Sequence, residues 1–166
     1  MIFVAVGTQL PFDRLIRAVD AWAGHRQRRD IVAQVGLTAY RACNIETHPF
    51  LDPREFRRCV AEAELTVSHA GMGTIITALE LGRNVVVMPR RAELSEHRND
   101  HQLATARHFL VQGRIKVAFN EGDLVTELDK LRNDAAPERI SEYASRSLID
   151  ALTAFLASES SGVRLP

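Results

Sequence analysis

The sequence has little cysteine, no excess of either charge and no long apolar run, and each shortage excludes a class of protein. Its 166 residues include two cysteines, Cys43 and Cys59, whose spacing matches neither a metal site nor a redox motif, so we expect reduced thiols. The 21 basic residues balance 21 acidic ones, which creates no field that favours nucleic acid. No apolar run approaches the roughly 18–20 residues of a membrane span, and residues 1–6 lack the features of a signal peptide. We therefore expect a cytoplasmic protein that does not bind nucleic acid.

Metal-binding patterns are also scarce. His97 and His101 lie four residues apart, which is a spacing found among metal ligands, but the residues between them lack the glutamate of the zinc-protease pattern. The chain contains no Asp-x-Asp motif. We therefore expect no metal and no cofactor, and a zinc site at the two histidines is the less favoured interpretation.

Short apolar runs alternate with helical patterns along the chain, and 46% of its residues are hydrophobic. Strict alternation of strand and helix is typical of right-handed βαβ units, which build a parallel sheet with helices on both faces. We therefore predict a Rossmann-like α/β fold in a single domain over residues 1–157, with Gly24 at the end of the first helix. Strands are expected at residues 2–6, 31–35, 65–67, 85–88 and 115–118, with a short strand near residues 43–46, and helices near residues 15–22, 53–60, 74–81, 98–111 and 123–131.

The C-terminal part carries an apolar stripe at helical spacing. Such a stripe predicts a last helix that either closes the sheet or docks a partner. Residues 158–166 are expected to form a frayed tail. The stripe consists of Ile140, Tyr143, Ser147, Leu148, Ala151, Leu152 and Phe155.

Three polar segments follow predicted strands: GTQ at residues 7–9, SHAGMGT at residues 68–74 and EHRNDHQ at residues 96–102. Ligands of parallel α/β sheets bind outside the carboxyl ends of the strands, so we expect the three segments on one rim. A glycine turn between a strand and a helix presents free N–H groups and the positive helix end, which suits a phosphate. The dense donors and acceptors of the third segment suit a polyhydroxylated ligand. Together the segments predict a nucleotide-sugar site.

Other interpretations of these segments stay open. Gly71 and Gly73 form half of a dinucleotide-binding fingerprint, but Ile76 occupies the position of the third glycine and no acid ends the next strand. The two glycines also suit a plain packing turn. Capping of a helix N-terminus explains Asp100 alone, although it does not explain the whole set of Glu96, Asn99, Asp100, His101 and Gln102.

The same segments resemble the donor-binding C-terminal half of GT-B glycosyltransferases. The chain is most similar to the small subunit of two-chain enzymes, which include bacterial exopolysaccharide and capsule glycosyltransferases and the eukaryotic dolichol-linked N-acetylglucosaminyltransferase. The resemblance covers about residues 1–120 and is carried by VGTQ at residues 6–9 with Phe12 and Asp13, by residues 68–74 and by residues 88–102. It implies an inverting hexosyltransferase that uses a UDP-sugar and acts on a lipid-linked saccharide.

The resemblance also assigns roles to residues of this chain. Many relatives have a ribose-binding glutamate where this sequence has Thr77, and Glu80 lies one turn later, so the chain departs from them at the ribose. Gln9, His69 and His101 are further candidates for ligand contact. The implied phosphate contacts are Gly7, Thr8, Gly71, Met72, Gly73 and Thr74, the uracil contacts are Phe50 and Leu51, and the sugar contacts are Glu96, Asn99, Asp100 and Gln102.

The resemblance further implies what this chain does not supply. In two-chain enzymes a separate, membrane-attached chain provides the acceptor site and the general base. We therefore expect no catalytic residue here, a heterodimer, and a position at the inner face of the membrane through that partner. Helix dipoles, rather than a metal ion, are expected to stabilise the leaving diphosphate. A non-catalytic enhancer of a partner enzyme is the alternative function.

Overall fold

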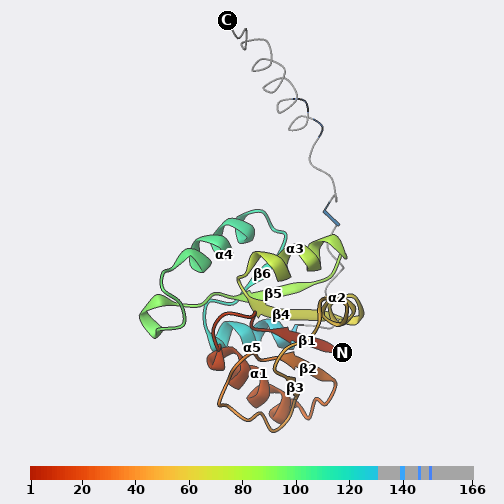
Figure 1. Cartoon of the computed structure of the whole chain (residues 1–166), viewed down its shortest axis with the longest axis vertical. Coiled ribbons are helices and arrows are strands. Elements are labelled where there is room, and N and C mark those ends of the chain that lie inside the picture. Colours follow the sequence, from red (N-terminus) through yellow and green to blue (C-terminus); the bar gives the residue numbers. More distant parts are fainter. Residues whose placement is uncertain (131–138, 141–145, 147–149, 151–166) are drawn as a thin grey trace, which may run out of the picture.

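A computed structural model describes residues 1–130, 139–140, 146 and 150 of the chain. Within this part the six strands form one parallel sheet in the order β3-β2-β1-β4-β5-β6 (Figure 1), which confirms the predicted Rossmann-like fold. The strands are β1 (Ile2–Ala5), β2 (Ile31–Gln34), β3 (Glu46–His48), β4 (Leu65–His69), β5 (Val85–Met88) and β6 (Lys116–Val117). The helices are α1 (Asp13–Arg26), α2 (Pro53–Glu62), α3 (Met72–Glu80), α4 (His101–Val111) and α5 (Glu121–Asp129), with a short 3-10 helix η1 (Ala92–Leu94).

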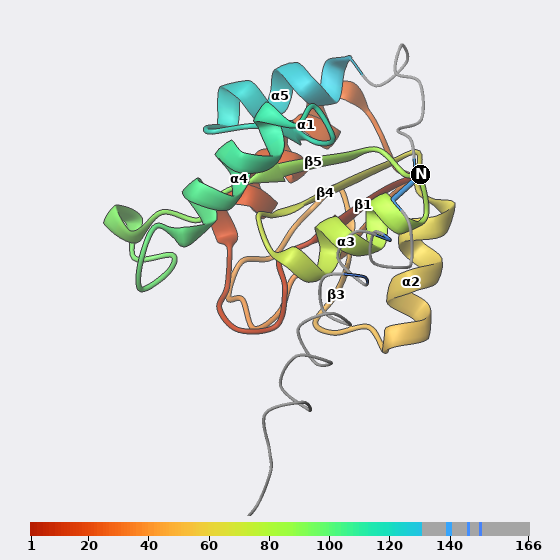
Figure 2. The same ribbon diagram turned by 90° about the horizontal axis from the view of Figure 1, so that it is seen from above.

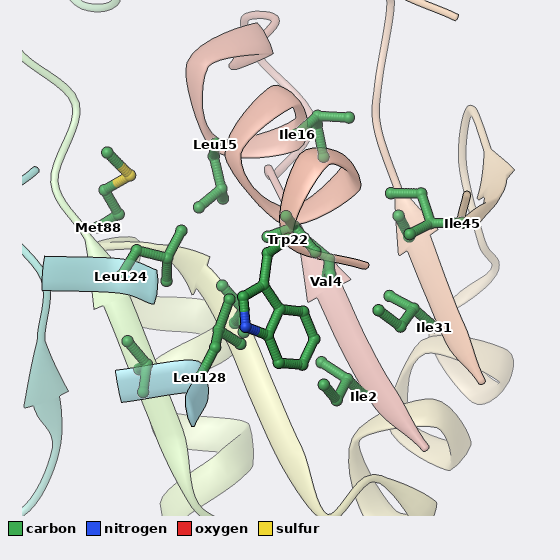
Figure 3. Close-up of a cluster of buried hydrophobic side chains, with 14 of the residues drawn as sticks. Ile2, Val4, Leu15, Ile16, Trp22, Ile31, Ile45, Met88, Leu124 and Leu128 are labelled. Atoms are coloured by element: carbon green, nitrogen blue, oxygen red, sulfur yellow. The ribbon is translucent and has the colours of Figure 1, made fainter. Parts of the chain in front are cut away.

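The side chains of β1 alternate between two cores, one on each face of the sheet. Ile2 and Val4 join the core under α1 and α5, where Trp22 is buried among aliphatic side chains (Figure 3). Phe3 and Ala5 join the core on the opposite face, which α2, α3 and α4 cover (Figure 2). A strand that is covered on both faces can be apolar at every position, which explains the continuous apolar run at residues 2–6.

Helix α2 begins at a complete capping box. The carboxylate of Asp52 accepts hydrogen bonds from the N–H groups of Arg54 and Glu55, and the Glu55 side chain accepts one from the N–H of Asp52. Pro53 occupies the first helical position, where its missing N–H costs nothing. These local signals fix where the helix begins and hold the preceding residue, Leu51, at the carboxyl edge of the sheet.

The predicted end of the first helix is wrong. Helix α1 continues past Gly24 to Arg26, and Gln27 provides a left-handed cap with φ of 53°. Gly24 packs closely against Asn44 instead: a Cβ at this position would lie 2.9 Å from Nδ2 of Asn44, so a side chain here would displace that amide.

The short strand β3 begins at Glu46, whereas the sequence placed it near residues 43–46. The N–H groups of Cys43 and Asn44 are used elsewhere, since both donate to the carboxylate of Asp20. The same carboxylate accepts a hydrogen bond from the hydroxyl of Tyr40 at 2.7 Å, and these bonds lower its pKa although burial opposes them. Asp20 therefore holds this connection in a loop.

Most of the C-terminal stripe and all of the predicted tail at residues 158–166 lie outside the described residues. Ile140 is described: it packs against the core beneath α3, and its N–H donates to the carbonyl of Leu79 at 3.2 Å. Within the described ranges, no helix has the length and apolar character needed to cross a bilayer.

Candidate functional site

A cavity of about 540 Å³ opens at the carboxyl ends of β1, β2, β4 and β5. The loops after β1 and β4 form its centre, the start of α2 forms one side, and residues that follow β5 form the other. The three polar segments of the sequence therefore meet at one rim of the sheet. The lining residues are Val6, Gly7, Thr8, Gln9, Leu10, Gln34, Leu51, Pro53, Phe56, His69, Gly71, Met72, Gly73, Thr74, Thr77, Arg90, His97, His101 and Gln102.

The N-terminus of α3 faces this cavity. Gly71 is the N-cap residue, and no side chain caps the helix. The N–H groups of Met72, Gly73 and Thr74 belong to the first turn, where a helix offers them no partner of its own. A Cβ at Gly73 would meet no atom within 4 Å, so the backbone there is open to a ligand.

The imidazole of His69 lies between the two glycine loops. A Cβ at Gly7 would lie 2.7 Å from Cε1 of His69, and a Cβ at Gly71 would overlap Nε2 of the same ring. Gly7 also has φ of 80°, which a residue with a side chain rarely adopts. Both glycines are therefore needed for the close packing of these loops against the histidine.

His69 is electrically neutral near pH 7. Burial lowers its pKa to about 4, and the positive charge of Arg90 contributes to the shift. Nδ1 of His69 lies 3.4 Å from the carbonyl oxygen of Ala5, to which it donates, so Nε2 carries the lone pair.

Arg90 fastens the loop after β1 to the loop after β5. Its side chain is 3% exposed and lies over the ring of Phe12, with Cζ 4.8 Å from the centroid. Arginine offers a fixed fork of five N–H donors, which here satisfies several backbone acceptors at once. The acceptors are the carbonyls of Val6 at 2.7 Å, Leu10 at 2.5 Å, Pro11 at 2.6 Å and Glu96 at 3.2 Å.

Glu96, predicted to bind sugar, makes internal contacts and does not line the cavity. Its carboxylate accepts from Nε of Arg14 at 2.6 Å and from Nη2 at 2.8 Å, and the N–H of Arg91 donates to it at 2.9 Å. Arg14 also donates to the carbonyl of Pro89. The pair therefore connects helix α1 to the segment that follows β5.

The other predicted sugar contacts divide into two groups. Gln102 lines the cavity, as does the further candidate His101, and Oε1 of Gln102 accepts from the N–H of Arg90 at 3.1 Å. Asn99 and Asp100 do not line it: Asn99 Oδ1 bonds the His101 ring, and Asp100 Oδ1 accepts from the N–H of Ala92 at 2.9 Å. Their sugar-binding roles stay predictions.

Of the two predicted uracil contacts, Leu51 lines the cavity, whereas Phe50 is 48% exposed and does not. Thr77, at the position of the ribose-binding glutamate of relatives, lines the cavity and donates its hydroxyl to the carbonyl of Gly73 at 2.8 Å. Glu80 lies away from the cavity and pairs with Arg57 at 3.1 Å.

Several lining residues were given no ligand role from the sequence, among them Leu10, Gln34, Pro53, Phe56 and Arg90, and His97 was considered only as a metal ligand. Gln34 had a detectable signal, since it is the one polar residue in the strand IVAQ. The other four had none that separates them from ordinary helix, capping or surface residues.

The described residues that line the cavity include no aspartate or glutamate, but they include the positively charged side chain of Arg90. Nδ1 of His97 is buried without a hydrogen-bond partner, and its ring contacts that of His101 edge to face at 4.4 Å between centroids. Across the described ranges, no group of three His, Cys, Asp or Glu side chains is arranged to hold a metal ion. The electrostatics of the cavity therefore favour an anion over a cation.

The fold and the cavity together define the class of protein: a Rossmann-like α/β domain of the kind that forms the C-terminal half of GT-B glycosyltransferases. The profile of the glycosyltransferase family 28 C-terminal domain matches residues 1–151, and the chain belongs to this family. No curated protein matches the sequence.

Solved structures share the fold at low identity. The glycotransferase of kitacinnamycin is 20% identical, with a TM-score of 0.60 over 80% of this chain and 35% of its own. MurG of Acinetobacter baumannii is 21% identical, with a TM-score of 0.55 over 79% of this chain and 41% of its own. ALG13 is 15% identical, with a TM-score of 0.57 over 91% of this chain and 93% of its own. The chain thus covers less than half of the first two proteins and nearly all of ALG13, and the likeness concerns the fold alone.

Proposed function

We propose that the cavity binds the diphosphate of a UDP-sugar and that the chain is the donor-binding part of an inverting glycosyltransferase. Its acceptor is a lipid-linked saccharide held by a membrane-attached partner chain. Membership of family 28 supports donor binding, and the resemblance of residues 1–120 to two-chain enzymes supports the division of labour. The observation that carries the proposal is the uncapped N-terminus of α3, which opens into a cavity lined by no described acidic residue.

The start of α3 offers an anion site that needs no metal ion. Free N–H groups at Met72, Gly73 and Thr74 converge there, and the helix macrodipole adds a partial positive charge. During glycosyl transfer, negative charge develops on the leaving diphosphate. Donors that are already in place stabilise that charge more in the transition state than in the ground state, and so they accelerate the reaction.

The half-open shape of the cavity supports the expectation that a second chain completes the site. Deprotonation of an acceptor hydroxyl needs a base close to it, and the resemblance to two-chain enzymes assigns that base to the partner chain. A half-open site also cannot exclude water from a reacting sugar or position a hydroxyl for attack. Both requirements are met if a second chain closes over the cavity.

Calorimetric titration of the chain with UDP and UMP tests the proposal. A charge-assisted contact contributes about 1.5–3 kcal/mol, so UDP should bind about ten-fold or more tightly than UMP. Gly73→Val should remove that difference, because its side chain would fill the open space in front of the helix end. Gly122→Val is the matched control, since Gly122 holds the equivalent second position of α5 and does not line the cavity.

Equal affinity of the wild type for UDP and UMP would overturn the assignment of the phosphate to α3. Complete failure to bind either nucleotide would favour the alternative function, an enhancer that stabilises a partner carrying its own donor site.

A further inference from the structure

The side of the cavity that follows β5 offers no charged acceptor to a sugar hydroxyl, because its two carboxylates are engaged elsewhere. Glu96 pairs with Arg14, and Asp100 accepts from the N–H of Ala92 at 2.9 Å. Neither carboxylate lines the cavity. Carboxylates are the side chains that only accept hydrogen bonds when ionised, so their absence changes which ligands this side can bind. The side chains that line it in their place are His97, His101 and Gln102.

His97 and His101 form a pair at the start of α4. Their rings meet edge to face, with 4.4 Å between the centroids. Nδ1 of His97 is buried and has no hydrogen-bond partner among the described residues. A buried polar atom without a partner is unfavourable, and a ligand that supplies the partner removes this cost. The pair therefore leaves an imidazole nitrogen for a ligand of the cavity.

The ionisable groups that act on His97 are all basic. Burial lowers the pKa of His97, and the neighbouring His101, Arg90 and Arg98 lower it further. His69, at the end of β4, is also close to the pair, and burial keeps it neutral near pH 7 by lowering its pKa to about 4. A negative group next to the pair would oppose all of these effects, because it stabilises a protonated imidazole. The local charges therefore favour an anionic group of the ligand at this place.

The diphosphate of the donor does not account for this preference. The proposed function places the diphosphate at the N-terminus of α3, where Met72, Gly73 and Thr74 offer their N–H groups. The histidine pair lies after β5 instead, in the segment that the sequence predicts to contact the sugar. An anionic group at the pair must therefore belong to the sugar.

We infer that the donor sugar is a hexuronic acid and that His97 and His101 bind its carboxylate. This inference rests on the proposed function, since it concerns the sugar of the same UDP-sugar. A hexuronic acid differs from a neutral hexose at one carbon, where a carboxylate replaces a hydroxymethyl group of similar size. The carboxylate forms a charge-assisted hydrogen bond with a protonated imidazole, which is about twice as strong as a bond between neutral groups. Charge, rather than shape, therefore distinguishes the two donors.

The experiment compares UDP-glucuronate with UDP-glucose by titration calorimetry on the wild type, His97→Gln and His101→Gln. The wild type should bind UDP-glucuronate about ten-fold or more tightly than UDP-glucose. Each variant should lose most of this preference, because glutamine keeps an N–H donor but cannot take up a proton. UDP affinity should change little, since the diphosphate lies at α3. His108→Gln is the matched control: His108 is exposed on α4, does not line the cavity and should leave the preference unchanged.

The same titrations at about pH 6.5 and about pH 8 test the charge of the pair. The preference of the wild type should be larger at the lower pH, because the carboxylate binds a protonated imidazole. Arg90 and Arg98 stay charged and His69 stays neutral in this range, and the phosphates and the carboxylate of the donors stay ionised. The change should therefore disappear in the variant that lacks both histidines of the pair.

Circular dichroism checks that each variant is folded. His101 is exposed, so His101→Gln tests the pair even if His97→Gln does not fold. Equal affinity of the wild type for the two donors, or tighter binding of UDP-glucose, would overturn the assignment of a hexuronic acid. A folded variant that keeps the full preference would overturn the role of the histidine that it lacks. A wild type that binds neither donor nor UDP would instead overturn the proposed function.

Discussion

The guanidinium of Arg90 lies over the ring of Phe12, with Cζ 4.8 Å from the ring centroid, so that a cation stacks on an aromatic side chain. The stacking leaves the edge of the guanidinium free to donate to backbone carbonyls of the loop after β1 and of Glu96. Most of the carbonyl groups that accept hydrogen bonds from Arg90 belong to the loop after β1, which carries Gly7 and Thr8. The geometry of that loop therefore depends on a residue more than 70 positions away in the sequence.

Arg90→Lys should weaken both the fold and nucleotide binding. Lysine keeps the charge but cannot supply several N–H donors from one plane or stack on Phe12 in the same way. We expect a loss of about 2–4 kcal/mol in unfolding free energy, measured by urea denaturation. UDP affinity should fall further than uridine affinity, because the displaced loop faces the diphosphate. Arg107→Lys, on the exposed face of α4, is the control, and a uniform loss for both ligands would show a general effect on folding.

The Arg14–Glu96 pair allows the predicted sugar-binding role of Glu96 to be tested. If Glu96 acts through Arg14, then Glu96→Ala, Arg14→Ala and the double variant should form a thermodynamic cycle with a coupling energy of about 1–3 kcal/mol in stability. The affinities for UDP and UDP-sugar should then fall together. A loss confined to the UDP-sugar, with no coupling to Arg14, would place Glu96 at the sugar as the sequence suggested.

The sugar-binding role of Gln102 stays a prediction, and the position of its side chain allows a test. Its Oε1 accepts from the N–H of Arg90, and its side chain is buried at the cavity wall, so its amino group is the part available to a ligand. Gln102→Glu keeps the contact with Arg90 and removes the donor. Transfer by the assembled enzyme should fall about ten-fold. The control is Gln9→Glu, which adds the same charge to the cavity lining, and Gln102→Glu should lower the UDP affinity by less than this control does. Equal losses for UDP and UDP-sugar would move Gln102 from the sugar to the diphosphate.

The apolar runs at residues 2–6, 31–35, 65–67 and 85–88 were sufficient to predict the sheet, because buried parallel strands are apolar on both faces. The convergence of the polar segments also followed from the sequence, since all carboxyl ends of parallel strands lie on one edge. The pairing of Arg14 with Glu96 did not, because these residues lie 82 positions apart and each resembles a surface charge. Local patterns indicate which residues reach the cavity, but long-range packing decides which of them remain free for a ligand.

The stability of the protein should depend on pH between about 7 and 5 through His69. Its pKa is lowered from 6.5 to about 4 in the folded state. Between pH 6.5 and pH 4 the imidazole is therefore protonated in the unfolded chain and neutral in the folded one. Unfolding free energy is therefore highest above pH 6.5 and is lost as the pH falls toward 4. The expected loss from pH 7 to pH 5 is about 2 kcal/mol.

Urea denaturation at both pH values, on the wild type and on His69→Asn, measures this effect. The variant should lose most of the pH dependence, whereas His108→Asn, on the exposed face of α4, should retain it. Arg90, His97 and His101 also surround His69, and the burial of His97 lowers its pKa in the same direction. A variant His69→Asn with the full wild-type dependence would assign the effect to His97 instead.

The chain alone should show no transferase activity, and activity should appear when a membrane-attached partner is added. The apolar stripe that begins at Ile140 is the proposed docking surface, and a truncation should keep Ile140, the stripe residue that the structure describes. Ile140 packs under α3 and bonds Leu79, so deletion of residues 141–166 is preferable to a cut before it. The truncated chain should stay folded and bind UDP with unchanged affinity, but it should fail to co-purify with the partner or support transfer. Burial of apolar surface contributes about 25 cal/mol per Å², so such a stripe would contribute strongly to association.

A truncated chain that unfolds would show that the stripe packs within the domain. Full activity of the purified single chain would contradict the two-chain proposal itself.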